Sequence, residues 1–264
     1  MTTDDTRIAV VTGASGGIGA AFAQRLANRG YDLLLVARNR GRLESLAGDI
    51  TTRTGVRAET LLADLTQDAE LARVEERLRT DATVRALVNN AGGGLFGPLA
   101  AADPGAVDEL IKLNVTAFTR LATAAVAGFT ARGDGLLVNV SSALALSFLP
   151  AGTVYSATKS YVLTFTQALQ QELADTGIRV QAFLPGAVRT GFWDGSGVEL
   201  GAIPEELVMS VDDAVDAAFA GLDAGENVTL PSLPDLSDWE AMENARRALA
   251  HSLSRSEPAV RYKR

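Results

Sequence analysis

Short runs of valine, leucine and isoleucine alternate along the chain with stretches in which apolar residues recur every three or four positions. Runs that are apolar throughout are typical of strands buried on both faces, as in a parallel sheet, whereas the intervening spacing is that of helices with one apolar face. The apolar runs cover residues 8–11, 33–36, 86–88, 136–140, 178–184 and, more weakly, 228–230. The main helical faces lie in residues 18–26, 43–50, 71–78, 107–121 and 161–173.

This alternation predicts an α/β protein with a doubly wound parallel sheet of the Rossmann type, flanked by helices in three layers. No linker interrupts the pattern before residue 190, so we expect residues 1–230 to form a single domain. Residues 189–210 begin with a segment rich in Gly, Trp, Phe and Pro and are expected to form a substrate loop. Residues 231–264 are expected to be a C-terminal extension packed on the same domain.

The charge balance and two scarce residue types exclude several kinds of protein. The 24 Lys and Arg against 32 Asp and Glu give a net charge of -8, which argues against a nucleic-acid or anionic-membrane partner. The chain has no cysteine and one histidine, His251, so we expect no metal site and no Ser-His-Asp triad. The acidic N-terminus and the polar and proline residues of the uncharged stretch 135–158 indicate no signal peptide and no spanning helix, and we expect a cytoplasmic protein.

The first apolar run leads directly into Gly13-Ala14-Ser15-Gly16-Gly17-Ile18-Gly19. A glycine turn between strand and helix lets a pyrophosphate approach the backbone, where the helix N-terminus offers free N–H groups. A glycine-rich loop alone is also compatible with a tight turn. At the first strand–helix junction of an α/β chain it favours nucleotide binding.

The end of the second apolar run bears on the choice of dinucleotide. A carboxylate there holds the adenosine ribose 2′-hydroxyl, whereas an arginine accommodates a 2′-phosphate. The sequence continues Val36-Ala37-Arg38-Asn39-Arg40, without an acid. Arg38 is therefore the candidate for the 2′-phosphate, and a solvated arginine at the start of the next helix is the alternative.

Tyr155 and Lys159 are spaced i, i+4 at the start of a helical stretch, which places both side chains on one face. An ammonium about 4 Å from a phenol contributes on the order of 4 kcal/mol at an effective dielectric near 20, enough to lower a tyrosine pKa toward neutrality. Such a tyrosine can protonate a carbonyl oxygen. Ser142 follows the strand predicted at 136–140, where its hydroxyl would bind the same oxygen. By itself, a tyrosine–lysine pair at this spacing most often marks a surface pair.

Together these motifs resemble the short-chain dehydrogenase/reductase family in its shorter form, from residue 8 to about residue 230. The matching positions are Thr12, Gly13, Gly17 and Gly19 in the cofactor loop, Asn89-Asn90-Ala91-Gly92 after the fourth strand, Asn114 in the long central helix, Ser142, Tyr155, Lys159, and Pro185-Gly186-Ala187-Val188-Arg189-Thr190. The order and spacing of all six motifs are those of the family.

The resemblance implies a mechanism. Tyr155 would be the general acid in reduction and the base in oxidation, and Ser142 would orient the carbonyl. Lys159 would lower the pKa of the tyrosine and hold the nicotinamide ribose. Asn114 would hold a water that connects Lys159 with bulk solvent.

The resemblance also implies which residues hold the dinucleotide. They are Gly13, Ser15, Gly17, Ile18 and Gly19 in the loop, Arg38, Asp64, Leu65 and Asn90 toward the adenosine, and Tyr155, Lys159, Pro185, Gly186, Val188 and Thr190 toward the nicotinamide. Many NADP-dependent members carry a second basic residue where this chain has Gly16. The expected preference for NADP(H) over NAD(H) therefore depends mainly on Arg38, with Ser15 and Arg40 as further contributors.

The segments expected around the substrate are 93–96, 143–149 and 192–203. They offer few charges and several large apolar side chains: Leu95, Phe96, Leu144, Phe148, Phe192 and Trp193. This composition favours an apolar ketone, aldehyde or secondary alcohol, although these residues could equally be core or lid packing. Family resemblance further implies a homodimer or homotetramer formed through helices near 107–130 and 155–176.

Two alternatives compete with an NADP(H)-dependent reductase. The first is an epimerase or dehydratase of the family's longer branch, which the chain length and the glycine spacing both disfavour. The second is a non-catalytic dinucleotide sensor that binds a protein partner. Sensors tend to lose the tyrosine–lysine pair, whereas here Asn114, Ser142, Tyr155 and Lys159 are all in place.

Overall fold

The computed structural model describes residues 6–263. The chain divides into two compact units, Met1–Pro231 and Ser232–Arg264. The first unit contains the predicted α/β sheet, and the second contains one helix and a short terminal turn.

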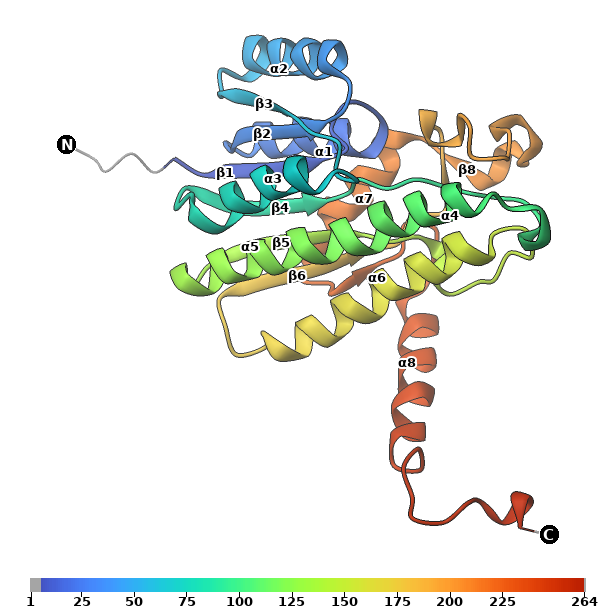
Figure 1. Cartoon of the computed structure of the whole chain (residues 1–264). Coiled ribbons are helices and arrows are strands. Elements are labelled where there is room, and N and C mark those ends of the chain that lie inside the picture. Colours follow the sequence, from blue (N-terminus) through green and yellow to red (C-terminus); the bar gives the residue numbers. More distant parts are fainter. Residues whose placement is uncertain (1–5, 264) are drawn as a thin grey trace. The chain divides into compact units, whose positions relative to one another are not determined.

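Seven parallel strands form the central sheet, in the order β3-β2-β1-β4-β5-β6-β9 (Figure 1). They are β1 Ile8–Thr12, β2 Asp32–Ala37, β3 Ala58–Leu62, β4 Val84–Asn89, β5 Gly135–Val140, β6 Ile178–Phe183 and β9 Val228–Thr229. The strand order reverses between β1 and β4, because the chain builds outward from β1 in both directions. Ligands of such sheets bind at the carboxyl ends of the strands beside this switch point.

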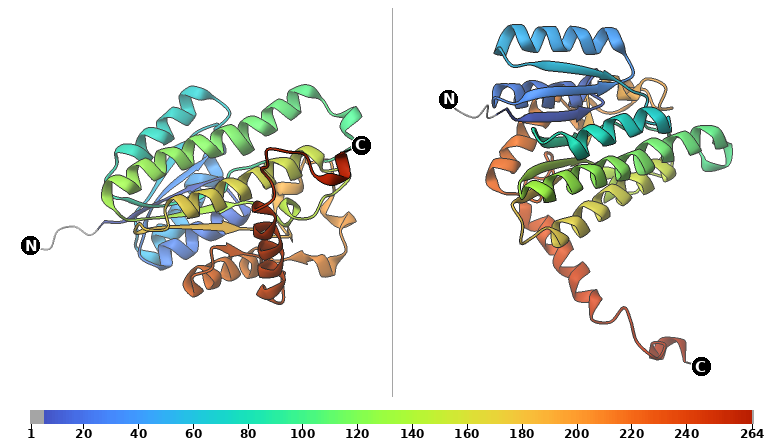
Figure 2. Two further views of the ribbon diagram at one scale, coloured as in Figure 1. Left: turned by 90° about the horizontal axis from the view of Figure 1, so that it is seen from below. Right: turned by 60° about the vertical axis from the view of Figure 1, so that its left-hand side comes forward.

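Helices cover both faces of the sheet, which confirms the three-layer prediction (Figure 2). One face carries α1 Gly17–Asn28, α2 Arg40–Thr54 and α7 Val211–Ala224; the other carries α3 Asp68–Thr80, α5 Phe118–Arg132 and α6 Thr153–Glu172. Alternate residues of each strand serve opposite faces. Leu33 and Leu35 pack with the first helix set, whereas Leu34 and Val36 pack with the second. A strand covered on both sides must therefore be apolar at every position.

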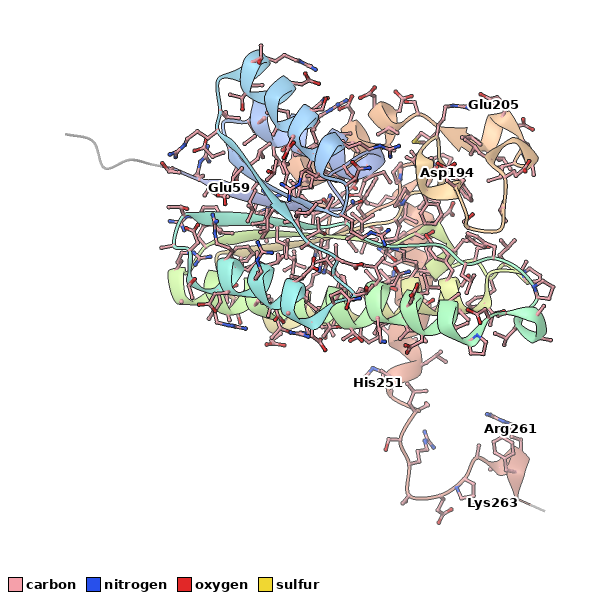
Figure 3. All side chains as sticks on the ribbon, turned by 45° about the horizontal axis from the view of Figure 1, so that its top comes forward. Glu59, Asp194, Glu205, His251, Arg261 and Lys263 are labelled. Carbon is pink, nitrogen blue, oxygen red and sulfur yellow. The ribbon has the colours of Figure 1, made fainter. Side chains whose placement is uncertain are left out.

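Two elements escaped the sequence patterns. Strand β3 has an exposed Glu59 (labelled in Figure 3) and only half-buried neighbours, because it lies at the sheet edge. Its sequence consequently lacks the continuous apolar run of the central strands. Helix α7 begins after Ser210, whose hydroxyl accepts from Asp213 N at 3.0 Å. This capping serine and the acidic first turn were a readable start signal.

The expected substrate loop is closed at its base by a second, two-stranded sheet. Strands β7 Ala187–Val188 and β8 Val208–Met209 pair in parallel at its two ends. Between them lie three short 3-10 turns, Gly191–Trp193, Leu200–Ala202 and Glu205–Leu207. The loop is therefore anchored at both ends next to the carboxyl end of β6.

One long helical segment changes its character midway. Helix α4 Pro104–Ile111 continues through a π-helical turn, Lys112–Ala117, into α5. By length and composition alone, Pro104–Arg132 is apolar enough to cross a membrane, with mean hydropathy 1.2 in its most apolar window. The sequence expectation overlooked this segment. Since 44% of that window is buried within the structure, its apolar residues have a packing role in the sheet layer.

The second unit consists of α8 Leu236–Ala250 and the 3-10 turn Val260–Tyr262. Asp235 caps α8 by accepting from Ser237 N at 2.8 Å. None of the described residues of α8 is buried, and Leu249, Leu253, Val260 and Tyr262 are all largely exposed. The expected packing of this extension on residues 1–230 stays a prediction.

Candidate active site

The glycine-rich loop closes tightly on itself between β1 and α1. Gly13 and Gly17 have backbone φ angles of 66° and 53°, which residues other than glycine rarely adopt. A Cβ on Gly19 would stand 2.4 Å from the carbonyl oxygen of Gly13 and 2.7 Å from Asn90 Nδ2. Gly16, by contrast, has nothing within 4 Å of its Cβ position. The loop thus leaves backbone exposed at the helix N-terminus, which suits a phosphate group.

Thr12 connects the glycine loop to the segment after β4 by hydrogen bonds. The sequence motifs did not predict this role. Its Oγ1 accepts from the backbone N–H of Asn90 and of Ala91, each at 3.0 Å, and donates to Val88 O at 3.3 Å. Asn90 Nδ2 in turn donates to Thr12 O at 2.8 Å. A hydroxyl residue at the end of the first strand, directly before the first glycine, is the sequence signal for this bridge.

The predicted adenosine-side residues lie at the ends of β2 and β3. Arg38 is exposed directly after β2, Asp64 is half-buried after β3, and Leu65 is buried. Burial opposes ionisation of Asp64, but hydrogen bonds from Thr66 and the positive charge of Arg38 outweigh it and lower the pKa of that carboxyl. Arg38 and Asp64 therefore share one local electrostatic environment.

The predicted nicotinamide-side residues lie around the start of the substrate loop. A Cβ on Gly17 would stand 2.9 Å from Thr190 Cγ2, so the glycine loop and the substrate loop meet at this point. Ile18 packs against the same apolar cluster as Val188. Pro185 and Val188 are buried, Ile18 and Thr190 are half-buried, and Gly186 is exposed.

Ser142, Tyr155 and Lys159 come together at the carboxyl end of β5. Tyr155 and Lys159 lie one turn apart on α6 and are 6% exposed each. The Tyr155 hydroxyl shares a hydrogen bond with the Ser142 side chain, whose Oγ also accepts from Leu144 N at 3.1 Å. Lys159 Nζ donates to Val140 O at 3.0 Å and lies 5.8 Å from the centre of the tyrosine ring.

Burial governs the protonation of the pair. It raises the pKa of Tyr155 to about 12, against which the hydrogen bond with Ser142 acts in the lowering direction. It lowers the pKa of Lys159 to about 8. The expectation that Lys159 lowers the pKa of Tyr155 toward neutrality is therefore not met by the chain's own groups, because the ammonium is directed to the Val140 carbonyl and the phenol is desolvated. In this arrangement the Tyr155 hydroxyl is neutral at pH 7.

Asn114 lies in the π-helical turn and is 2% exposed. Its Oδ1 accepts from Gly93 N at 2.9 Å, and its Nδ2 donates to Gly93 O at 3.0 Å and to Thr158 Oγ1 at 3.1 Å. A Cβ on Gly92 would stand 3.1 Å from Asn114 Oδ1 and 3.4 Å from Lys159 Nζ. The amide oxygen and the ammonium thus border the same point, in a π turn of the kind often found at functional sites.

An aromatic cluster adjoins the tyrosine. The Tyr155 ring centre lies 5.1 Å from that of Phe96 and 5.6 Å from that of Phe192, and Phe96 stacks on Trp193 at 6.2 Å. Leu95 and Leu144 pack against this cluster as expected. Leu110 of α4, which the sequence patterns did not assign here, belongs to it as well. Phe148 does not, since it is 83% exposed.

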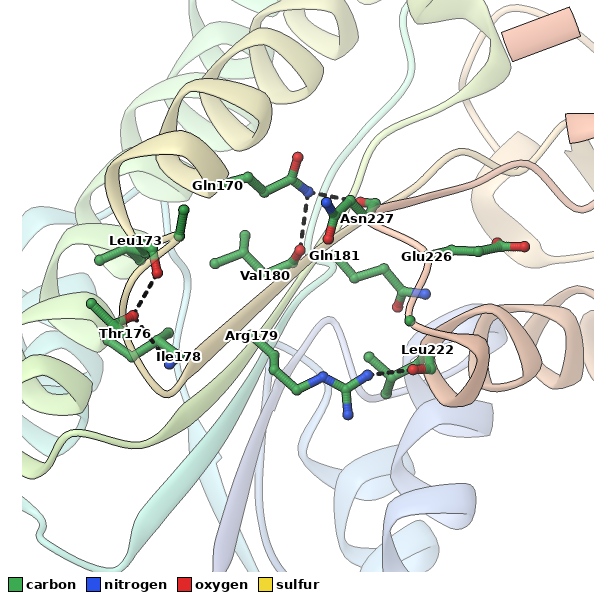
Figure 4. Close-up of a pocket in the computed structure, with 12 residues that line it drawn as sticks. Gln170, Leu173, Thr176, Ile178, Arg179, Val180, Gln181, Leu222, Glu226 and Asn227 are labelled. Carbon is green, nitrogen blue, oxygen red and sulfur yellow. Dashed lines mark hydrogen bonds between the residues drawn. The ribbon is translucent and has the colours of Figure 1, made fainter. Parts of the chain in front are cut away.

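A cavity of about 350 Å³ lies elsewhere, between the end of α6, the start of β6 and the turn after α7 (Figure 4). Gln170, Arg179 and Asn227 are among its lining residues. It shares no residue with the site described above, and it borders the amino end of β6 rather than the carboxyl end. We therefore do not assign the substrate to it.

Known proteins resemble this chain over most of its length. The family model described as short chain dehydrogenase matches residues 7–198. An uncharacterised oxidoreductase of Staphylococcus saprophyticus is 34% identical over 185 residues, which are 70% of this chain and 79% of that protein. The chain spans about 60% of the length of several vertebrate relatives, to which it is 33–34% identical.

Two solved structures are similar over nearly the whole chain. A short-chain dehydrogenase from Sphingobium yanoikuyae in complex with NADPH is 43% identical with a TM-score of 0.93, covering 97% of this chain and 100% of the other. A bulky-bulky ketone specific alcohol dehydrogenase from Comamonas testosteroni is 40% identical with a TM-score of 0.90, covering 98% and 100%.

Proposed function

Because the chain belongs to the short-chain dehydrogenase/reductase family of oxidoreductases, we propose that it transfers a hydride between NADP(H) and an apolar ketone, aldehyde or secondary alcohol. The observation that carries this proposal is the buried group of Ser142, Tyr155 and Lys159 at the carboxyl end of β5. Strand β5 neighbours β4, which borders the switch point of the sheet, and α/β proteins of this kind bind their ligands at that edge.

The glycine loop fits a dinucleotide. The Cβ positions of Gly13, Gly17 and Gly19 are all crowded by neighbouring groups, so the backbone there is bare and its N–H groups can face a pyrophosphate. Asp64, Leu65 and Asn90 would hold the adenosine, and Pro185, Gly186, Val188, Thr190 and Ile18 would hold the nicotinamide. A dinucleotide held there would supply hydride chemistry to the site.

The chain's own residues supply and replace the proton. Tyr155 carries it on Oη at neutral pH, because burial keeps its pKa near 12, and donates it to the substrate oxygen during reduction. Ser142 shares a hydrogen bond with Tyr155 and can orient the same oxygen. Lys159 and Asn114 border one point at Gly92 and would return the proton from solvent. In oxidation Tyr155 would act as the base.

The preference for NADP(H) over NAD(H) depends on Arg38. It is exposed at the end of β2, with no acid in the strand-end position. Arg40, the other candidate, lies 3.4 Å from Glu44 within its own helix, so part of its charge is already paired. Ser15 is half-buried in the glycine loop, where its hydroxyl would add a contact. The NADPH complex of the similar Sphingobium protein supports this choice.

An apolar substrate is supported by the cluster of Phe96, Phe192 and Trp193 around Tyr155. These rings offer large apolar surface and no charge next to the proton donor. The ketone-specific dehydrogenase from Comamonas points to the same chemical class.

The test is NADPH consumption with a panel of apolar ketones, aldehydes, diketones and quinones, with NADH in parallel. Tyr155→Phe should lose about 100- to 10,000-fold in turnover, because removal of a general acid costs that much. Its affinity for NADPH should change little, since the ring remains.

Three outcomes separate the alternatives. Turnover by Tyr155→Phe at the wild-type rate would contradict the assigned proton donor. Tight NADPH binding without turnover of any compound would favour a dinucleotide sensor. Failure to bind either dinucleotide would exclude both.

We also propose a cytoplasmic homodimer or homotetramer that assembles through α4, α5 and α6. Ile111 and Tyr161, on the outer side of these helices, are 41% and 38% exposed, and Tyr161 stacks on Phe165 at 6.1 Å. Light scattering of the full chain should give a mass of two or four chains, and a monomer at micromolar concentration would contradict the assembly.

A further inference from the structure

Helix α6 contains two buried threonines that make the same pattern of hydrogen bonds. Thr158 Oγ1 donates to Tyr155 O at 2.8 Å and accepts from Asn114 Nδ2 at 3.1 Å. Thr166 Oγ1 donates to Val162 O at 2.6 Å and accepts from Asn139 Nδ2 at 3.0 Å. Thr158 is 4% exposed and Thr166 is 0% exposed. The first pair borders the candidate active site, and the second lies two turns farther along the helix.

The direction of the Thr158 bonds is fixed by chemistry. A backbone carbonyl only accepts, so the threonine must give its single proton to Tyr155 O. Its oxygen can therefore only accept from Asn114, and the Asn114 group facing it must be the NH₂. The amide oxygen is then left to face Gly93 N, beside the point at Gly92 that Lys159 Nζ also borders.

Among residues 6–263, Thr158 makes the side-chain hydrogen bond that joins Asn114 to the helix carrying the tyrosine and the lysine. The other bonds of Asn114 go to the backbone of Gly93, which belongs to the segment after β4. Without the threonine hydroxyl, the π turn and α6 would keep their apolar packing but lose this polar connection. The position of Asn114 relative to Lys159 would then be less well defined.

We propose that Thr158 is a positioning residue that holds the Asn114 amide in place beside Gly92, at the point that Lys159 Nζ also borders. The proposal rests on the proposed function, in which Lys159 and Asn114 return the proton to Tyr155. An oxygen dipole close to an ammonium favours its charged form. Thr158 therefore acts on the reaction through Asn114 and Lys159 and does not itself touch substrate or cofactor.

The chain permits a direct readout of this effect, because it contains only three lysines, Lys112, Lys159 and Lys263. In protein labelled with ¹³C at the lysine ε position, NMR would follow three titrating signals. Burial lowers the pKa of Lys159 to about 8, while Asp108 raises the pKa of Lys112. The Lys159 signal is thus set apart from that of Lys112. The ring of Tyr155, a titratable side chain, lies 5.8 Å from Lys159 Nζ.

The experiment compares Thr158→Val, Thr158→Ser and the matched control Thr166→Val. Valine keeps the shape and removes the hydroxyl, and serine restores it. For Thr158→Val we expect the Lys159 titration of the dinucleotide-free protein to move downward by about half a pH unit, because the amide oxygen is less well held. We expect kcat to fall about five- to tenfold with the KM for NADPH unchanged. Thr158→Ser should restore both values.

Thr166→Val sets the baseline for simple loss of a buried threonine–asparagine bond. It should lower the melting temperature about as much as Thr158→Val and leave both the Lys159 titration and kcat unchanged. Equal effects of the two valine variants on the titration, or no effect of Thr158→Val, would overturn the positioning role. Because the titration needs no turnover, this result is independent of the ketone panel, whose failure would instead contradict the proposed function.

Discussion

The two halves of the candidate active site are built on opposite principles. On the proposed cofactor side, backbone would contact the pyrophosphate, because Gly13, Gly17 and Gly19 have no side chain and their Cβ positions are already crowded. On the proposed substrate side, large rings would make the contacts, because Phe96, Phe192 and Trp193 cluster with Tyr155. The glycine half leaves backbone accessible, whereas the aromatic half presents large side chains.

This difference determines how each half responds to change. At Gly13 and Gly19 the backbone has little room to yield, since the groups that crowd it are backbone atoms and the Asn90 amide, which is hydrogen-bonded to Thr12 O. Aromatic side chains can rotate or shift with a neighbour. We therefore expect cofactor binding to be intolerant of small additions and substrate selectivity to be adjustable.

Gly19→Ala should produce the largest effect. Its methyl group would stand 2.4 Å from Gly13 O, which is backbone and cannot move without opening the loop. Dinucleotide affinity should fall about 100-fold or more, measured by fluorescence titration. Gly16→Ala is the matched control, because its Cβ position is open and its φ of 173° suits any residue. Equal losses in both variants would disprove the rigid glycine loop.

Arg38→Asp should produce the next largest effect. Replacing the cation by an acid removes a charge-assisted contact to a 2′-phosphate, so NADPH affinity should fall about 10- to 100-fold while NADH affinity rises. Arg40→Asp is the control, since Arg40 is already paired with Glu44. Tighter binding of NADH than of NADPH by the wild type would contradict the preference itself.

Gly94→Ala should alter the substrate side more mildly. Its Cβ would stand 2.6 Å from Phe192 Cζ, the far end of a side chain that can shift. The KM for the best ketone should change about three- to tenfold, with NADPH affinity unchanged. Gly93→Ala meets Leu110 at an ordinary 3.6 Å and should change neither. A loss of NADPH affinity in Gly94→Ala would mean that the two halves are not independent.

The smallest effect is one of stability and depends on pH. Burial lowers the pKa of Lys159 to about 8 from 10.5. The buried charge therefore lowers the free energy of unfolding fully below pH 8, and this destabilisation disappears as the pH rises from 8 to 10.5. Lys159→Met should therefore be more stable than wild type at pH 7, by up to about 3 kcal/mol.

Urea denaturation at pH 7, 8, 9 and 10 should show this advantage shrinking toward alkaline pH. Lys112→Met should show no such trend, because Asp108 raises the pKa of Lys112 and keeps it charged across the range. Above pH 10 the raised pKa of Tyr155 acts in the opposite direction, so that the stability it contributes is lost in both proteins. A constant difference between Lys159→Met and wild type would contradict a buried ammonium.

The central strands of the sheet could be predicted from the sequence, whereas the edge strand β3 could not. Strands such as β1 and β5 are covered on both faces and carry a continuous apolar run that is readable without a structure. Strand β3 lies at the sheet edge and none of its residues is fully buried, so the exposed Glu59 interrupts the pattern. The family and the α/β class are confirmed.

The candidate site divides in the same way. Glycine spacing and the tyrosine–lysine interval are local patterns, so they could be read directly. The bond from Thr158 to Asn114 joins residues 44 positions apart, and Leu110 reaches the aromatic cluster only through the fold of α4. The protonation of Tyr155 depends on burial, which a tyrosine–lysine interval does not report.

The π turn at Lys112–Ala117 has a consequence for how the long helix is used. A π turn holds one residue more than an α turn, so the helical phase before it and after it differs by about 100°. This offset lets α4 direct Leu110 to the aromatic cluster while α5 directs Leu121 and Ala125 to the sheet layer. The continuous helical segment can therefore pack on both the aromatic cluster and the sheet layer, although these lie on different sides of it. Adding or deleting one residue in this turn would therefore rotate one of these two helical faces away from its neighbour.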